Sequence, residues 1–207
     1  MNTQDKVDNA VHTTSLADSY AGLMAGLGIK RYHLKRTLRT QTVAEHSARI
    51  VAFIHMVHPN ASGNLLRAAI LHDVSEIVTG DVPSPVKWNN PVLAAELNRV
   101  SGEYEIAHGL RMTLFGREAR LLKWADYAEG VQFCTDELRM GNENMLGSLR
   151  RYVDAMNRVP GWGYDLKADP AEEDSRTAQD EEVALRQLAV TTLLTDNANH
   201  AERRYDY

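Results

Sequence analysis

Apolar residues recur at helical spacing along almost the whole chain, and no convincing stretch alternates apolar and polar residues as a half-buried β-strand does. Residues that can cap a helix stand where several of these patterns begin. They are Ser15, Thr42 (which opens a Thr-x-x-Glu capping box) and Ser62. Further helical patterns cover about residues 92–110, 117–140, 142–159 and 182–194. The sequence therefore predicts an all-α protein, a compact bundle of about six or seven helices.

Prolines and acidic residues divide the chain. Two prolines lie within Asp81–Pro85, so this stretch is predicted to be a loop. Residues 165–182 are acidic and rich in alanine, which is typical of a solvated linker. We expect both ends, residues 1–12 and 197–207, to be loosely ordered. A chain of 207 residues favours one core. We place it at 13–160, followed over 161–207 by an acidic linker and a C-terminal helix that packs on the core or extends it.

Composition excludes some classes of function. Lys and Arg number 23 against 28 Asp and Glu, a formal net charge of -5, which argues against a protein that coats nucleic acid or an anionic membrane. No apolar run approaches the roughly 20 residues of a membrane span. The polar start does not resemble a signal peptide, and the single cysteine, Cys134, fits a reducing compartment. We expect a cytoplasmic protein with no nucleic-acid or membrane partner.

Four side chains are candidate ligands of one metal ion: His46, His72, Asp73 and Asp126. His46 lies among apolar residues of a predicted helix, and the His72-Asp73 pair ends another. Asp126 stands in an apolar helical stretch, where a carboxylate is costly unless something pairs with it. Two imidazoles and two carboxylates suit Zn, Mn, Fe or Co. Taken singly, each residue has a structural alternative: His46 as a core histidine, His72-Asp73 as a common dipeptide, and Asp126 as the partner of Arg31 or another cation.

Three longer motifs accompany these residues: RTQTVAEHS over 39–47, LHDVSE over 71–76, and TGDVPSPVK over 79–87. Together they resemble the HD-domain phosphohydrolases, in the 5′-deoxynucleotidase branch, over about residues 20 to 160. The resemblance implies an HD-domain helical bundle in which His46, His72, Asp73 and Asp126 bind one divalent metal ion (Zn, Co or Mn). The branch contains bacterial deoxynucleoside 5′-monophosphatases and phage dATP triphosphohydrolases found with 2-aminoadenine genomes.

Glu76 stands three residues after Asp73, one helical turn along, so both carboxylates face the same side. The resemblance implies that Glu76 is the catalytic acid–base, acting on the attacking water or on the leaving 5′-oxygen. The alternative for Glu76 is a solvated carboxylate at a helix end.

Residues 19–44 contain five cations and no Asp or Glu, which suits the binding of several phosphate charges. The alternative is a solvated basic turn. By resemblance, Arg31 and Lys87 contact phosphate and Asp81 accepts a hydrogen bond from the 3′-hydroxyl of the deoxyribose. Arg39 is a candidate brace for the site.

The resemblance also points to residues near the sugar and base. Tyr32 stands where family members commonly carry Trp, and this departure bears on sugar and base selectivity. Leu34 and Pro85 are expected near the base, with ordinary packing as their alternative.

The predicted reaction is hydrolysis of dATP to deoxyadenosine and triphosphate, with dADP and dAMP as further candidate substrates. The cationic density around Arg31 and the compact stretch between His72 and Asp126 favour this reaction. A deoxynucleoside 5′-monophosphatase is the close alternative. A helical nucleotide-binding module without catalysis is a third possibility, against which the complete ligand set argues. By resemblance the protein forms a homo-oligomer, a dimer or a hexamer, and a phage origin implies the host cytoplasm.

Overall fold

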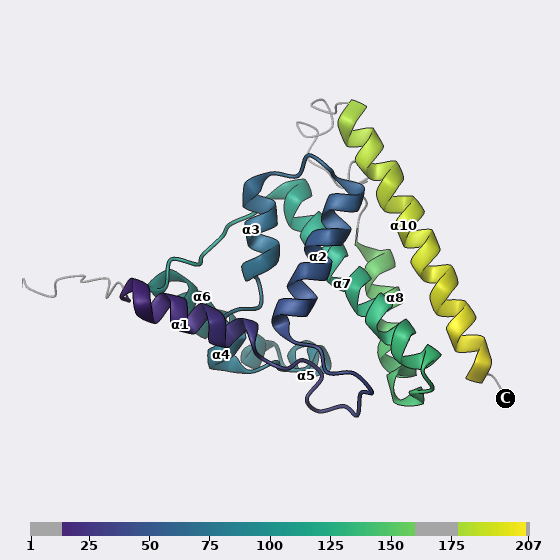
Figure 1. Ribbon diagram of the computed structural model, residues 1–207, viewed down its shortest axis with the longest axis horizontal. Helices are drawn as coiled ribbons and strands as arrows, with labels where there is room; N and C mark the ends of the chain where they lie inside the picture. Colours follow the sequence, from purple (N-terminus) through teal and green to yellow (C-terminus); the bar gives the residue numbers. More distant parts are fainter. Residues whose placement is uncertain (1–13, 160–177, 206–207) are drawn as a thin grey trace, which may run out of the picture.

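The computed structural model describes residues 14–159 and 178–205, and these residues contain helices and no strand. Seven of the helices have nine residues or more, and Figure 1 shows their arrangement. They are α1 (Leu16–Leu27), α2 (Val43–Val57), α3 (Gly63–Leu71), α6 (Pro91–Ala107), α7 (Gly116–Arg139), α8 (Leu146–Arg158) and α10 (Ala178–Glu202). Two shorter helices are α4 (Glu76–Thr79) and α5 (Ser84–Asn89). The all-α prediction is confirmed.

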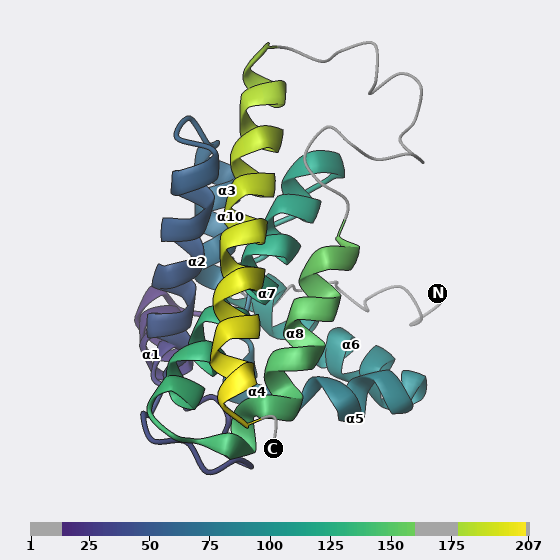
Figure 2. The same cartoon turned by 90° about the vertical axis from the view of Figure 1, so that its right-hand side faces the viewer.

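The core lies where α2, α7, α8 and α10 pack side by side (Figures 1 and 2). Its largest fully buried side chains include Ile50 and Ile54 of α2, Trp124 and Phe133 of α7, and Leu149 of α8. Helices α1, α4, α5 and α6 lie together at one end of the molecule, beside the start of α2. No helix in the described ranges is long and apolar enough to cross a membrane.

The predicted caps begin three helices. The side-chain oxygens of Ser15, Thr42 and Ser62 accept hydrogen bonds from backbone N–H groups three residues on, at 3.1, 3.2 and 3.0 Å respectively. Each bond satisfies one of the donors that a helix start leaves without an intrahelical partner. The cap of α2 fixes where that helix begins and therefore which face carries His46.

Two expectations from the sequence are wrong. Asp81–Pro85 is not all loop, because α5 starts at Ser84 and holds Pro85 in its first turn. Proline is tolerated there since the N–H of that position has no intrahelical acceptor. Residues 197–202 are not loosely ordered but continue α10, with Ala198 and Ala201 buried against the bundle.

The acidic linker and residues 1–12 lie outside the described residues, except that residues 178–182 belong to α10. The predicted helix over 142–159 begins as the 3-10 turn Glu143–Met145 before α8.

Candidate active site

The four candidate metal ligands come from three parts of the fold and converge. His46 lies on α2, His72 and Asp73 follow the end of α3, and Asp126 lies on α7. Nε2 of His46 lies 3.3 Å from Oδ1 of Asp126 and 3.5 Å from Oδ2 of Asp73. Nε2 of His72 lies 3.4 Å from the same Asp73 oxygen. One ring nitrogen each of His46 and His72 and one carboxylate oxygen of Asp126 all lie within 4.8 Å of one another.

Both histidines direct Nε2 toward this cluster. Nδ1 of His46 lies 2.7 Å from a carboxylate oxygen of Glu129, and Nδ1 of His72 lies 2.9 Å from the carbonyl oxygen of Ala69. Because both neighbours are acceptors, each Nδ1 carries the proton, and in the neutral ring Nε2 keeps its lone pair. Both Nε2 atoms are buried, and neither is hydrogen-bonded to any residue that the structure describes. These two free imidazole nitrogens and the adjacent carboxylates fit a divalent cation of the zinc type.

The carboxylates around His46 also attract a proton. Burial and the charge of Arg31 oppose the charged ring, but Asp126 and Glu129 outweigh them and raise the pKa of His46 to about 9. A proton on Nε2 and a metal ion cannot share one lone pair, so the two compete for the site.

Glu76 lies beside the cluster, in the first turn of α4. Burial, together with the negative charges of Asp73 and Asp81, raises the pKa of Glu76 to about 9. One carboxyl oxygen of Glu76 is buried and makes no hydrogen bond within the described part of the chain. A carboxyl group that can hold a proton near neutral pH, with a free oxygen, is able to act as a general acid or base.

Arg31 connects this cluster to the polar connection between α1 and α2. Its guanidinium is largely buried, 10% exposed, and lies 3.4 Å from Glu129 and 3.2 Å from the side-chain oxygen of Gln41. Glu129 therefore contacts both His46 of the candidate metal site and Arg31, the candidate phosphate-binding residue.

Tyr32 has a positive φ of 57°, which is uncommon for a residue with a side chain. Two contacts hold it there. Its N–H donates to Oδ2 of Asp81 at 2.9 Å, and its ring stacks on Phe133 with centroids 4.7 Å apart. The Tyr32 hydroxyl lies 3.3 Å from that of Tyr152. One face of the ring is thus covered by the core, and the guanidinium carbon of Arg31 also lies over the ring, 5.5 Å from its centroid.

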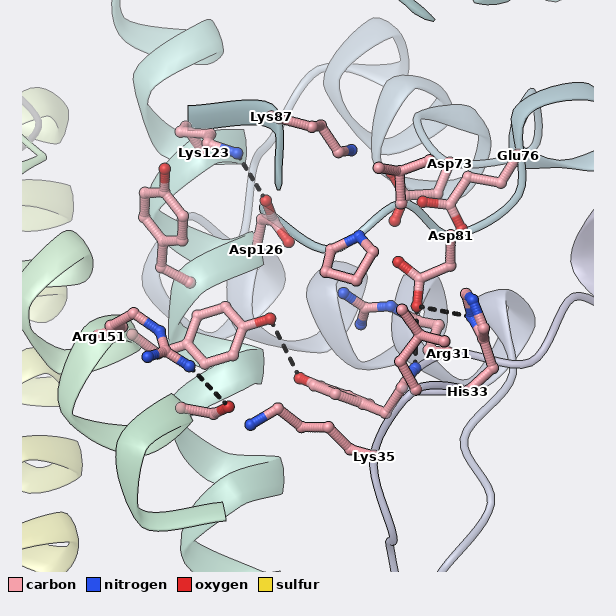
Figure 3. A pocket seen from close by; sticks show the side chains of 17 residues that line it. Arg31, His33, Lys35, Asp73, Glu76, Asp81, Lys87, Lys123, Asp126 and Arg151 are labelled. Carbon is pink, nitrogen blue, oxygen red and sulfur yellow. Dashed lines mark hydrogen bonds and ion pairs between the residues drawn. The ribbon is translucent and has the colours of Figure 1, made fainter. Parts of the chain in front are cut away.

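A pocket of about 420 Å³ opens beside the cluster (Figure 3). Eight of the residues predicted from the sequence line it, namely Arg31, Tyr32, Leu34, Asp73, Glu76, Asp81, Lys87 and Asp126. His46 is fully buried behind it, and Leu34 at the mouth is 70% exposed. Pro85 belongs to α5, but its side chain lies outside the described part of the structure.

Several functional candidates were missed at the level of the sequence. Lys123 lies 2.8 Å from Asp126, and Arg151 and Tyr152 of α8 complete one wall of the pocket. Glu129 follows Asp126 by nearly one turn among the same buried apolar residues, so the argument that singled out Asp126 applies to it as well. The residues of α8 carry no motif, and only the packing of α8 on α7 brings them to the site.

Comparison with known proteins agrees with this geometry. The family model described as "5′-deoxynucleotidase YfbR-like" matches residues 20–160, which include every candidate metal ligand. The chain belongs to this family. It is therefore an HD-domain metal-dependent phosphohydrolase, as the motifs predicted.

Curated relatives are 5′-deoxynucleotidases. The protein YPTB2590 of Yersinia pseudotuberculosis serotype I (strain IP32953) is 31% identical, in a match that covers 66% of this chain and 82% of the relative. A 5′-deoxynucleotidase of Yersinia pestis (strain Pestoides F) is also 31% identical, over 59% of this chain and 75% of its own.

Two solved structures share the fold. One is the cyanophage S-2L HD phosphohydrolase DatZ, bound to dA and one catalytic Zn²⁺ ion, with a TM-score of 0.54 and 20% identity over 84% of this chain and 96% of that one. The other is the HD-domain phosphohydrolase lin2634 of Listeria innocua, with a TM-score of 0.56 and 19% identity over 88% and 99%.

Proposed function

We propose that this protein is a metal-dependent 5′-deoxynucleotidase that hydrolyses deoxynucleoside 5′-monophosphates to deoxynucleosides and phosphate. The observation that carries the proposal is the convergence of two histidines with two aspartates that line the same pocket as Glu76 and Arg31. The family match and the names of the curated relatives support the monophosphate over dATP, the substrate first favoured on the sequence.

In this proposal His46, His72, Asp73 and Asp126 hold one divalent cation, with Zn, Co and Mn as candidates. Such a cation supplies positive charge next to the phosphoryl group and makes a nearby water more acidic. The free Nε2 atoms of the two histidines support this assignment.

The chemical step replaces one oxygen on phosphorus by another. A water oxygen forms a bond to phosphorus and gives up a proton, the bond from phosphorus to the 5′-oxygen breaks, and the leaving 5′-oxygen takes up a proton. We assign the proton transfer to Glu76, whose carboxyl group lies in the pocket with one oxygen unbonded.

Substrate binding is assigned to the other residues of the pocket. Arg31 and Lys87 are placed to bind phosphate, and Lys87 makes no ion pair with a described residue. Oδ2 of Asp81 already accepts from Tyr32, so Oδ1 is the atom left for the 3′-hydroxyl. Tyr32 and Leu34 lie on the same wall, where the sugar and base would sit, and Pro85 is kept as a base contact on the resemblance alone.

Hydrolysis of dATP to deoxyadenosine and triphosphate is the second candidate function, because the ester broken is the same and the pocket holds cations that pair with no carboxylate of the described residues. The proposal also includes a cytoplasmic location, supported by the free, buried Cys134, and a homo-oligomer. Exposed apolar side chains on α1, among them Leu16, Tyr20 and Met24, support self-association.

The reaction is tested with the purified protein loaded with Zn²⁺, Co²⁺ or Mn²⁺. Deoxynucleoside mono-, di- and triphosphates and ribonucleoside monophosphates are incubated with it, and the products are separated by chromatography. Release of deoxynucleoside and phosphate from the monophosphates supports the proposal. Failure to hydrolyse any nucleotide with any metal would instead favour a nucleotide-binding module without catalysis.

Two substitutions test the assigned roles. Glu76→Ala is expected to retain metal and lose at least about 100-fold in kcat, the contribution typical of a general acid–base. Asp126→Ala is expected to lose metal, as measured by the metal content of the purified variant. Glu103→Ala, on the exposed face of α6, is the control and should change neither quantity. Full activity of Glu76→Ala, or a normal metal content of Asp126→Ala, would contradict the corresponding role.

A further inference from the structure

The cations that line the pocket differ in how their charge is balanced. Arg31 lies 3.4 Å from Glu129, and Lys123 lies 2.8 Å from Asp126. Lys35 and Arg151 also line the pocket, yet neither forms an ion pair with a described residue. Like Lys87, these two cations have no carboxylate partner among the described residues, so their charge is not neutralised there.

These two cations lie together, away from the proposed reaction centre. Figure 3 shows Lys35 and Arg151 on one side of the pocket and Asp73, Glu76 and Lys87 on the opposite side. Lys35 is half-buried, and its burial together with the charge of Arg151 lowers the pKa of its ammonium group. Two cations held near each other without a counter-charge repel, and a bound anion relieves this repulsion.

Local structure holds both side chains at this place. The N–H of Lys35 donates to the carbonyl oxygen of Tyr32 at 2.8 Å and closes a turn. The guanidinium of Arg151 donates to the hydroxyl oxygen of Ser148 at 3.4 Å. Ser148 accepts in that bond and lines the pocket, so its own proton is available to a ligand.

We propose that Lys35 and Arg151, with the hydroxyl of Ser148, form a second anion subsite that binds the β- and γ-phosphates of a deoxynucleoside di- or triphosphate. The inference rests on the proposed function and extends it, because it adds deoxynucleoside di- and triphosphates to the nucleotides that the same pocket can bind. Each phosphate beyond the first adds negative charge, and the two unpaired cations provide the charge to match it. A monophosphate held at Arg31 and Lys87 leaves the subsite empty.

The test compares KM values for dAMP, dADP and dATP in the metal-loaded protein and in the variants Lys35→Ala and Arg151→Ala. In each variant the ratio of KM for dAMP to KM for dATP is expected to fall on the order of tenfold, the effect of one lost charge-assisted hydrogen bond. The ratio removes any change that affects all nucleotides equally. In the unaltered protein it should also fall as salt is raised, because salt screens these partly exposed charges.

Two further variants sharpen the comparison. Ser148→Ala, which removes the hydroxyl that fixes Arg151, is expected to lower the ratio by less than Arg151→Ala does. Arg36→Ala is the matched control, because Arg36 follows Lys35 directly but is exposed and does not line the pocket. Its ratio should equal that of the unaltered protein. Circular dichroism checks that each variant is folded.

Several outcomes would overturn the inference. One is a ratio unchanged within twofold in both Lys35→Ala and Arg151→Ala. Another is that the protein hydrolyses dAMP while dATP is neither a substrate nor an inhibitor. That result would leave the proposed function intact. If deoxyadenosine 3′,5′-bisphosphate, rather than dATP, loses affinity in the variants, the second phosphate is a 3′-phosphate. If the only change in the variants is how strongly inorganic phosphate competes with the nucleotide, the subsite binds a separate anion. Both results contradict the proposal.

Failure of the proposed function is distinguishable. If no nucleotide is hydrolysed, calorimetric titration of the metal-loaded protein with inorganic tripolyphosphate still tests the subsite. Binding that is weakened at least tenfold in Lys35→Ala and Arg151→Ala supports it, and absence of binding overturns it.

Discussion

At the scale of single residues, Glu129 is the group on which most of the site depends. Its side chain is fully buried and accepts from Nδ1 of His46 at 2.7 Å and from the amide of Gln41 at 2.6 Å, while Arg31 lies 3.4 Å away. Burial opposes its charge, but His46 and Arg31 keep the pKa of Glu129 below its ordinary value. A carboxylate behind a metal-binding histidine sets the orientation and tautomer of the ring.

Replacing Glu129 by alanine is expected to weaken zinc binding by about 10- to 100-fold, because His46 loses the acceptor that fixes its ring. It also leaves the buried guanidinium of Arg31 without its carboxylate, at a cost to stability of about 3–5 kcal/mol. Chelator competition measures the first effect and urea denaturation the second. Glu129→Gln keeps an acceptor oxygen, so its zinc affinity and its stability should lie between those of the unaltered protein and those of Glu129→Ala. Glu45→Ala, which removes a carboxylate paired with Arg49 on the exposed side of α2, is the control. Normal zinc affinity in a folded Glu129→Ala variant would contradict this role.

The thiol of Cys134 is expected to be unreactive in the native protein. It is fully buried in the core, and burial, aided by the charge of Glu129, raises the pKa of Cys134 far above its ordinary value. Only the thiolate reacts with iodoacetamide. Alkylation of the native protein should therefore be much slower than alkylation of the denatured protein at every pH between 7 and 9. In denaturant the rate should rise with pH as the thiol ionises near about 8.5. Equal rates in both states would show that the thiol is not enclosed.

Some residues of the site could be predicted from the sequence and others could not. The motifs named residues that the structure brings together at the cluster and its pocket, because those residue types stand at fixed spacing. Neither Lys35 nor Arg151 belongs to a motif, so the sequence gives neither of them a role in the site. Whether Lys35 faces Arg151 depends on how α8 and the connection between α1 and α2 each pack on α7, and no local pattern of either segment contains that information.

At the scale of elements, the connection from α1 to α2 carries Arg31 and Tyr32 and has no helix of its own. Its conformation is held by α7. The buried carboxylate of Glu137 accepts from the backbone N–H groups of Leu38 and Arg39 at 2.7 and 3.0 Å. Arg39 does not line the pocket; its guanidinium lies 3.4 Å from Asp136, which agrees with a bracing role. The basic connection, which contains no Asp or Glu, is thus held in place by Asp136 and Glu137 near the end of α7.

Glu137→Ala is expected to leave two backbone donors without acceptors and to destabilise the protein by about 2–5 kcal/mol. Since Arg31 is carried by the released connection, KM for the nucleotide should rise more than kcat falls. Thermal denaturation and steady-state kinetics measure the two effects. Glu137→Gln, which retains an acceptor oxygen, should recover part of both, and Glu143→Ala, at an exposed position nearby, should change neither. A large stability loss with an unchanged KM would show that the connection does not position Arg31.

Helix starts were predictable because a cap is a local interaction. Ser15, Thr42 and Ser62 each bond a backbone N–H three residues away, and the sequence contains both partners. The end of α10 was not predictable in this way. Residues 197–202 carry no strong helical signal, and this turn is helical because Ala198 and Ala201 are buried against the bundle.

At the scale of the whole molecule, α10 lies beyond the region that the family model matches, yet it shares the core of that region. Val183, Leu194 and Ala198 are buried against α2, α7 and α8. The indole N–H of Trp124 donates to the hydroxyl of Thr191 at 2.9 Å. Residues 1–159 alone would expose this apolar face to water, so we expect α10 and the rest of the bundle to unfold together.

Two neighbouring leucines of α10 test this expectation. Leu194 is 4% exposed and faces the core, whereas Leu193 is 60% exposed. Leu194→Ala is expected to lower the free energy of unfolding by about 2–5 kcal/mol, because it removes buried methyl groups and leaves a cavity. Leu193→Ala, the same change at an exposed site, should lie within about 0.5 kcal/mol of the unaltered protein. Urea denaturation followed by tryptophan fluorescence and by circular dichroism should give one coincident transition in all three proteins. Equal effects of the two substitutions would refute the packing of α10. A separate early transition in circular dichroism would show that α10 unfolds independently of the helices that carry the site.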